Sequence, residues 1–157
     1  MATTSVNSAS RVGLSTIASL APWFSRLVLL IPTLIMIVIA VRFIGNPIHA
    51  ASQTGVTLST PEALTDTRVV GALALTIAFA IASSITSRQR LRMGHAIVIV
   101  LMAFILAVRL YGFATDGTTL AMGDQRVKII GETLFLALNA IGLFLQTYFG
   151  KQSAVSQ

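Results

Sequence analysis

Long apolar runs alternate with short polar connections along the chain. Four such runs lie roughly at 27–45, 69–87, 96–113 and 127–149. Each is close to the about 20 residues that a helix needs to cross a hydrocarbon layer about 30 Å thick. The runs lack the alternation of a barrel strand, and only helices or closed barrels satisfy their backbone groups in lipid. The pattern predicts an all-α, integral membrane four-helix bundle.

The ends of the chain carry weaker signals. Apolar residues recur at helical spacing shortly before the first run, as in Leu14, Ile17 and Phe24, which is typical of a short helix at the membrane interface. We therefore expect residues 1–25 to form a disordered tail and a short interfacial helix. The four-helix domain is expected over 26–150, followed by a cytoplasmic tail at 151–157.

Composition narrows the function classes. Of 157 residues, 55% are hydrophobic and 10% are charged, whereas soluble domains carry about 25% charged residues. The absence of cysteine excludes disulfides, thiol nucleophiles and thiolate metal sites. No phosphate-binding loop, metalloprotease motif or nucleophile elbow is present. We expect no catalytic residue, metal or cofactor, and favour a protein that is not an enzyme.

Charge distinguishes the two sides of the predicted membrane domain. The N-terminus, the middle loop and the C-terminus carry six basic residues and no acid, with the densest group at Ser87 to Arg92. The other side carries five basic and five acidic residues. Because cytoplasmic loops are enriched in lysine and arginine, both termini are expected in the cytoplasm. The net charge of +6 then faces anionic lipid headgroups, so it requires no nucleic-acid partner.

A short pattern occurs twice. AVRFIG at 40–45 precedes DTRVVG at 66–71, and AVRLYG at 107–112 precedes DQRVKIIG at 124–131. Two helices per half would give both copies the same orientation, as in parallel repeats. The pattern thus indicates a 2+2 internal repeat, and chance similarity between apolar sequences is the other interpretation.

Each predicted helix brings one arginine to the outer membrane boundary. In the favoured interpretation, each extends to the interface and pairs with an acid. In the other, the four guanidinium groups converge on an anion such as a phosphate. The arginines are Arg42, Arg68, Arg109 and Arg126, and the aspartates expected in structural ion pairs are Asp66, Asp116 and Asp124.

Glu132 and Asn139 place polar groups inside the fourth run. Glu132 follows Arg126 by six residues, about 9 Å along a helix. At that depth an ionisable group usually has a partner, and Arg109 is the expected one. A structural ion pair is favoured over a proton carrier or general acid. Asn139 shares the Glu132 face and is a candidate ligand-binding residue.

Small residues and histidines complete the pattern. The second run has one stripe at Ala72, Thr76, Ala80 and Ser84 and another at Ala74, Ala78 and Ala82. Both could admit a neighbouring helix closely, within the bundle or in a partner, and the other interpretation is an ordinary alanine-rich membrane sequence. His49 and His95 are expected on opposite sides of the membrane, as polar surface rather than as ligands.

Residues 64–145 resemble a bacterial family of small four-helix membrane proteins known as domain of unknown function 4345. The resemblance rests on LTDTRVVGALAL at 64–75, AVRLYGFATDG at 107–117 and GETLFLALNAIGL at 131–143. It implies the fold, a multi-pass protein of the bacterial inner membrane, and a shared set of residues without an assigned reaction. That set comprises Arg68, Gly71, Arg109, Asp116, Gly117 and Glu132.

Two functions fit these features. We favour a non-enzymatic accessory or scaffold subunit of a larger membrane complex, whose partners are membrane lipids and either other membrane subunits or further copies of itself. The alternative is a binder or carrier of a small anionic or lipid-like ligand in an outer-leaflet pocket. The residues of that pocket would be Arg42, Arg68, Arg109, Arg126, Glu132 and Asn139.

Overall fold

The computed structural model describes the backbone of residues 5–116 and 125–155, and the side chains of 19–116 and 125–148. All regular elements in these ranges are helices. Four of them are long and apolar enough to cross a membrane, as expected for a multi-pass membrane protein. The helices are α1 (Ser5–Gly45), α2 (Pro47–Gln53), α3 (Pro61–Ile85), α4 (Leu91–Thr115) and α5 (Gln125–Val155).

Helix α1 is continuous over 41 residues. It includes residues 5–25, most of the segment expected to form a disordered tail and a short interfacial helix. The apolar span within it begins at Ser19, and the helix continues through Pro22 and Pro32. At the other end of the chain, α5 continues to Val155, so the expected tail at 151–157 is helical over most of its length.

The short α2 was not predicted. Asn46 starts it, since its side chain accepts a hydrogen bond from the backbone N–H of His49, and Pro47 suits the first helical position. Thr60 caps α3 in the same way, accepting from the N–H of Ala63 at 3.2 Å. These caps turn the chain from α1 into α3 within a short connection.

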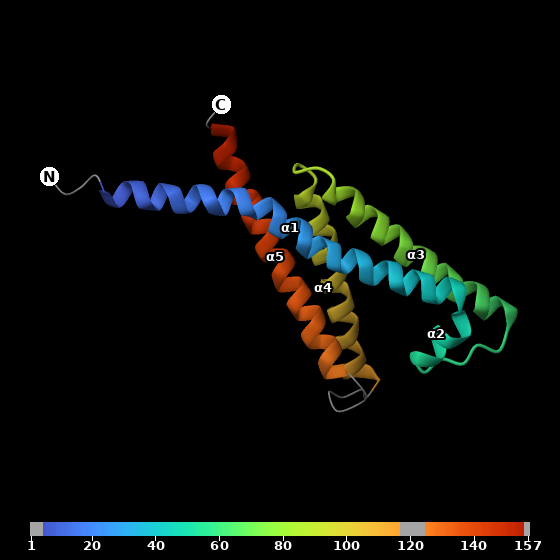
Figure 1. The fold of residues 1–157 in the computed structure, drawn as a ribbon. Helices are drawn as coiled ribbons and strands as arrows, with labels where there is room; N and C mark the ends of the chain where they lie inside the picture. The colour runs from blue at the N-terminus through green and yellow to red at the C-terminus, as the bar shows by residue number, and fades with distance from the viewer. Residues whose placement is uncertain (1–4, 117–124, 156–157) are drawn as a thin grey trace.

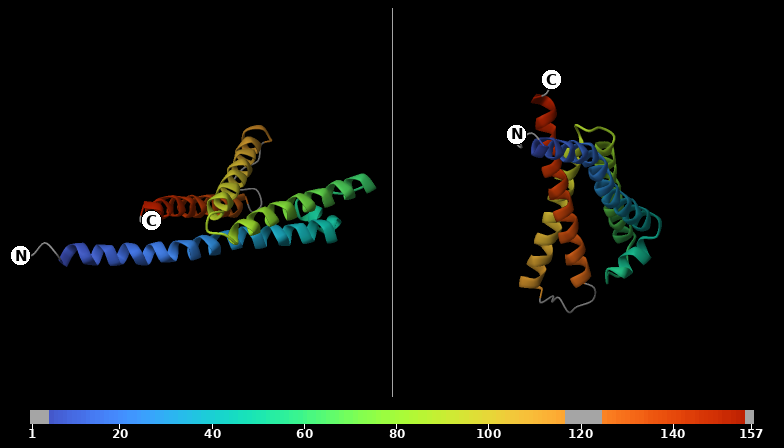
Figure 2. Two further views of the ribbon diagram at one scale, coloured as in Figure 1. Left: turned by 90° about the horizontal axis from the view of Figure 1, so that it is seen from above. Right: turned by 60° about the vertical axis from the view of Figure 1, so that its left-hand side comes forward.

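The four long helices form two antiparallel pairs (Figure 1). Helix α3 packs along α1, and α4 packs along α5. The pairs meet near the α3–α4 turn and diverge from there, as the right view of Figure 2 also shows. Over the described residues α3 and α5 make no contact. The bundle is therefore closed at one end and open at the other.

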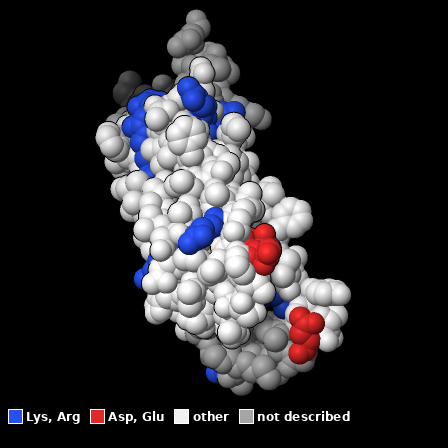
Figure 3. Space-filling model, turned by 90° about the vertical axis from the view of Figure 1, so that its right-hand side faces the viewer, with Lys and Arg blue, Asp and Glu red and all other residues white. Residues whose placement is uncertain are grey.

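The end that carries the α3–α4 turn, with Arg88, Arg90 and Arg92, is called the basic end, and the diverging end is called the open end. Figure 3 shows a group of Lys and Arg side chains at the basic end, and the Asp and Glu visible on that face nearer the open end. The apolar core lies toward the basic end, where the pairs meet. It consists of Leu29 from α1, Ile81 from α3, and Leu91, Val98 and Met102 from α4.

Gly71 sets the close packing of α3 on α1. A Cβ atom at this position would lie 2.8 Å from Ile44 Cγ1, 3.0 Å from Phe43 Cβ and 3.1 Å from the Ala40 carbonyl oxygen. Close approach of backbones is a main source of attraction between helices in lipid. Gly131, the corresponding glycine of the second AVRxxG half, has nothing within 4 Å of such a Cβ. The two pairs are therefore packed by different means.

We predict opposite effects of alanine at these two glycines. Alanine favours a helix over glycine by about 1 kcal/mol, so Gly131→Ala should leave the protein equally or slightly more stable. Gly71→Ala should lower the free energy of unfolding by about 1 kcal/mol, because the methyl group separates α3 from α1. Reversible unfolding in mixed detergent micelles measures both. Equal effects of the two variants would contradict the proposed role of Gly71.

Candidate functional site

Arg109 and Glu132 form a half-buried ion pair between α4 and α5. Arg109 Nε donates to both carboxylate oxygens of Glu132, at 2.9 and 2.7 Å, and Nη2 donates to Oε1 at 2.6 Å. Nη1 donates to Oε1 of Gln125 at 2.8 Å. The pairing of Arg109 with Glu132 that the sequence predicted is confirmed.

In this geometry the positive charge of Arg109 is neutralised by the Glu132 carboxylate of the same chain. A guanidinium that faces one carboxylate along its edge makes parallel, charge-assisted hydrogen bonds, which are both strong and directional. The pair is neutral as a unit, so it leaves no net positive charge for an external anion. The ion pair therefore links α4 to α5 near the open end.

The other predicted arginines do not join this pair. Arg42 and Arg68 belong to α1 and α3, which diverge from α4 and α5 toward the open end (Figure 2). Arg126 is the second residue of α5 and is exposed. None of these three forms an ion pair within the described ranges. The structure thus does not gather the four guanidinium groups into one cage.

The predicted aspartate pairs also differ from expectation. Asp66 and Asp116 make no ion pair with any residue the structure describes. Asp116 instead accepts a hydrogen bond from the Thr115 hydroxyl at 2.9 Å. Asp124 lies outside the described residues. Asp66 lies two residues before Arg68 on the same helix, and side chains two positions apart on a helix do not face each other.

A second polar group is buried where α4 meets α5. His95 and Asn139 are both 0% exposed, and His95 Nδ1 lies 2.8 Å from Asn139 Oδ1. The Asn139 amide donates to the Phe135 carbonyl of its own helix, so its oxygen faces the ring and Nδ1 is the donor. The expectation that His95 is polar surface is wrong, because its helix face points into the bundle.

Gly142 provides the space for the His95 ring. A Cβ atom at Gly142 would collide with the ring atoms Cε1, Nε2 and Nδ1. His95 Nε2 is buried against this glycine and has no hydrogen-bond partner among the described residues. The sequence signal for this arrangement was the position of Asn139 on the same face as Glu132, which indicated a polar face of α5 but not the helix that contacts it.

Gln146 extends this polar contact to α1. Its side-chain amide donates to the Ala21 carbonyl at 3.1 Å and to the Ser25 hydroxyl at 2.8 Å. Arg92 Nε donates to the Gln146 carbonyl at 3.1 Å. Gly94 on α4 lies directly against Ser84 of α3. All four long helices thus meet at one polar junction, defined by the buried residues Ser25, Ser84, His95, Asn139 and Gln146.

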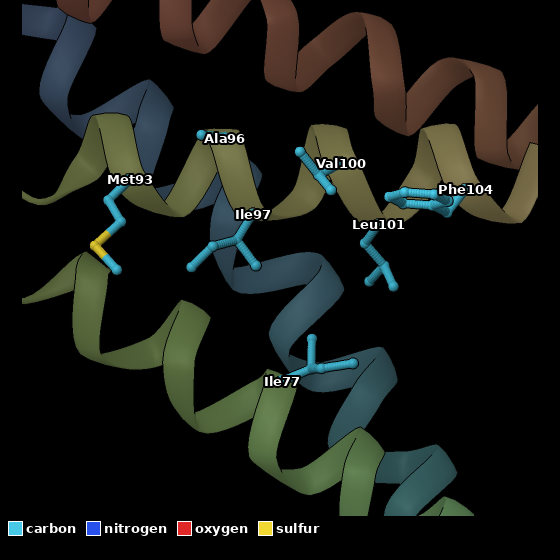
Figure 4. A pocket seen from close by; sticks show the side chains of 7 residues that line it. All are labelled: Ile77, Met93, Ala96, Ile97, Val100, Leu101 and Phe104. Carbon is cyan, nitrogen blue, oxygen red and sulfur yellow. The ribbon is translucent and has the colours of Figure 1, made fainter.

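An apolar groove of about 460 Å³ runs between α3 and α4. Figure 4 shows Met93, Ile97 and Leu101 directed from α4 toward α3, and Ile77 on α3 across from them. A further hollow of about 390 Å³ continues past Phe104 along α4 and ends beside Arg109. The groove was not predicted from the sequence, because it depends on how the two helix pairs diverge and not on a local pattern of residues.

No family model, curated protein or solved structure matches the chain. The resemblance to the four-helix family of unknown function therefore stays a prediction.

We predict that the Arg109–Glu132 pair is structural and replaceable. Arg109→Leu alone should lower the free energy of unfolding by about 1–3 kcal/mol, because Glu132 remains half-buried without its partner. Adding Glu132→Leu should recover most of that loss. Arg126→Leu, at an exposed arginine without an ion pair in the described structure, should cost less than about 0.5 kcal/mol. Reversible unfolding in detergent measures all of these, and a double variant no more stable than Arg109→Leu would contradict the pair.

We predict that Gly142 is required by the ring of His95. Gly142→Ala should cost about 1–3 kcal/mol of stability, because the added methyl forces the ring away from Asn139. In a His95→Ala background the same change should be neutral or should stabilise α5 by up to about 1 kcal/mol. The four proteins of this cycle, compared in unfolding experiments, measure the coupling. A Gly142→Ala effect that is equal in both backgrounds would show that the ring is not the cause.

Proposed function

We propose that the protein is a non-enzymatic accessory or scaffold subunit that assembles with other membrane helices. The carrying observation is the unequal use of the two small-residue stripes of α3. Ala74 and Ala78 of one stripe are buried, whereas Ala72 and Thr76 of the other are exposed, and that stripe becomes buried only at Ser84. Small residues at four-residue spacing let helix backbones approach closely in lipid. The exposed stripe is therefore a face suited to a helix from outside the chain.

The use of buried polar groups supports the same role. His95 bonds Asn139, Gln146 bonds α1, and Arg109 bonds Glu132. Each of these contacts joins two helices, and polar contacts between helices are a common means of fixing helix position in membranes. The polar side chains that could have served catalysis serve the packing of the fold.

The setting of this subunit is part of the proposal. We place it in the bacterial inner membrane with the basic end and both termini in the cytoplasm, on the strength of the arginine-rich α3–α4 turn. The two antiparallel pairs, α1 with α3 and α4 with α5, agree with a 2+2 parallel repeat. Because the helices pack differently at Gly71 and at Gly131, the two halves of such a repeat would have changed in sequence after the duplication.

The alternative, a binder of a small anionic ligand in an outer pocket, has less support. Arg109 is held by Glu132 and Gln125. Arg42 and Arg68 lie on the other helix pair. An anion at the open end would therefore meet separate arginines rather than a cluster of them.

We predict that a bulky residue in the exposed stripe disrupts assembly. Thr76 bonds only the Ala72 carbonyl of its own helix, so Thr76→Leu removes no contact to another helix. In native membranes solubilised with mild detergent, the protein should migrate on a native gel as an assembly larger than its own 16.6 kDa chain in the same micelle. Thr76→Leu should shift that assembly about tenfold toward the free chain.

The matched control is Leu75→Phe, because Leu75 is exposed on α3 and lies outside the stripe. It should leave the assembly intact. Co-expression of two differently tagged copies tells self-association from association with another subunit. A wild-type chain that migrates alone, or an assembly that Thr76→Leu leaves unchanged, would refute the proposed role.

A further inference from the structure

The groove between α3 and α4 begins at the basic end. Its first lining residue, Met93, lies three residues after Arg90, and its last, Phe104, lies eleven residues further along α4. Eleven residues of helix rise about 16 Å. One leaflet of a bilayer has about 15 Å of hydrocarbon. The groove therefore follows a single leaflet from its charged surface to the midplane.

Two arginines at the mouth of the groove have free charge. Arg88 and Arg90 are exposed in the α3–α4 turn, and neither takes part in an ion pair within the part of the chain that the structure describes. Arg92 is different, since its Nε donates to the Gln146 carbonyl on α5. Arg92 keeps its positive charge beside Met93, but its side chain is engaged by α5, so the guanidinium groups without a contact to another helix in the described structure are those of Arg88 and Arg90.

We propose that this groove is a binding site for an anionic phospholipid. One acyl chain lies along Met93, Ile97 and Leu101 against Ile77, and the phosphate is held by Arg88 and Arg90. Arginine binds phosphate through paired N–H donors, and basic sites at the ends of membrane helices select anionic headgroups. The wall of the groove is formed entirely by apolar side chains, as an acyl chain requires.

Charge decides between a lipid and a helix of a second copy in the groove. A second copy inserted with the same orientation would bring its own Arg88 and Arg90 to the same end. Like charges would then oppose each other where the groove begins. An anionic lipid neutralises the same charges. Neither Ala72 nor Thr76 lines the groove, so the lipid site is argued from residues other than those of the proposed assembly role.

Lipid selectivity can be measured inside and outside the groove with tryptophan reporters. The chain has one tryptophan, Trp23, so Trp23→Phe gives a silent background. Phe104→Trp then places the reporter in the groove at a side chain that is 68% exposed. The matched control is Leu134→Trp on α5, where the native side chain is 57% exposed and does not line the groove. Quenching is compared in vesicles of dibrominated phosphatidylglycerol and dibrominated phosphatidylcholine.

The groove reporter should bind phosphatidylglycerol about 25-fold more strongly than phosphatidylcholine, since each of the two arginines contributes about fivefold at a membrane surface. At the Leu134→Trp reporter, the ratio of phosphatidylglycerol binding to phosphatidylcholine binding should be near one. Arg88→Gln with Arg90→Gln should reduce the groove ratio to about twofold or less, whereas the corresponding double lysine variant should keep most of it. The lysine variant also preserves the charge that orients the protein in the membrane.

Three results would overturn the proposal. The first is an equal lipid ratio at Phe104→Trp and Leu134→Trp. The second is a groove ratio that the double glutamine variant leaves unchanged while the protein stays monodisperse and helical. The third is a groove reporter that neither lipid quenches, which would show that protein covers the groove.

Discussion

The polar junction at the basic end is the contact on which the arrangement of the four long helices depends. Lipid offers no hydrophobic force to drive helices together, so they associate through close packing and polar contacts. Gln146 bonds α1, Asn139 holds His95, and Gly94 brings α4 against Ser84. Because these contacts lie at one end, the two helix pairs are joined there and free to diverge elsewhere. The groove between α3 and α4 is a direct result.

The two pairs reach similar geometry by different chemistry. Between α1 and α3, the absence of a side chain at Gly71 lets the two backbones approach closely. In α4–α5, Arg109 and Glu132 bridge the helices with three hydrogen bonds. Short motifs that look alike in the sequence therefore serve different purposes. AVRFIG ends a tightly packed helix, whereas AVRLYG supplies one half of an ion pair.

Much of this fold follows from the sequence by simple physics. Membrane thickness dictates the length of the four apolar runs, and the partner of Glu132 follows from the cost of a lone charge in lipid. The burial of His95 did not follow, because a face of α4 becomes interior only once α5 is placed. The separation of Arg42 from Arg109 has the same origin, since it depends on the angle between two helix pairs. Local pattern predicts the helices and tertiary packing decides which faces meet.

The length of helix α1 determines how a force on its first part would act on the other helices. Its 41 residues extend about 60 Å, twice the hydrocarbon thickness, and its first part projects away from the other helices (Figure 1). Pro22 interrupts the hydrogen-bond ladder where the projecting rod meets the packed part, and proline is a usual place for a helix to bend. The neighbouring Ala21 carbonyl accepts a bond from Gln146. A force applied to the rod would therefore act as torque on the contact that joins α5 to α1.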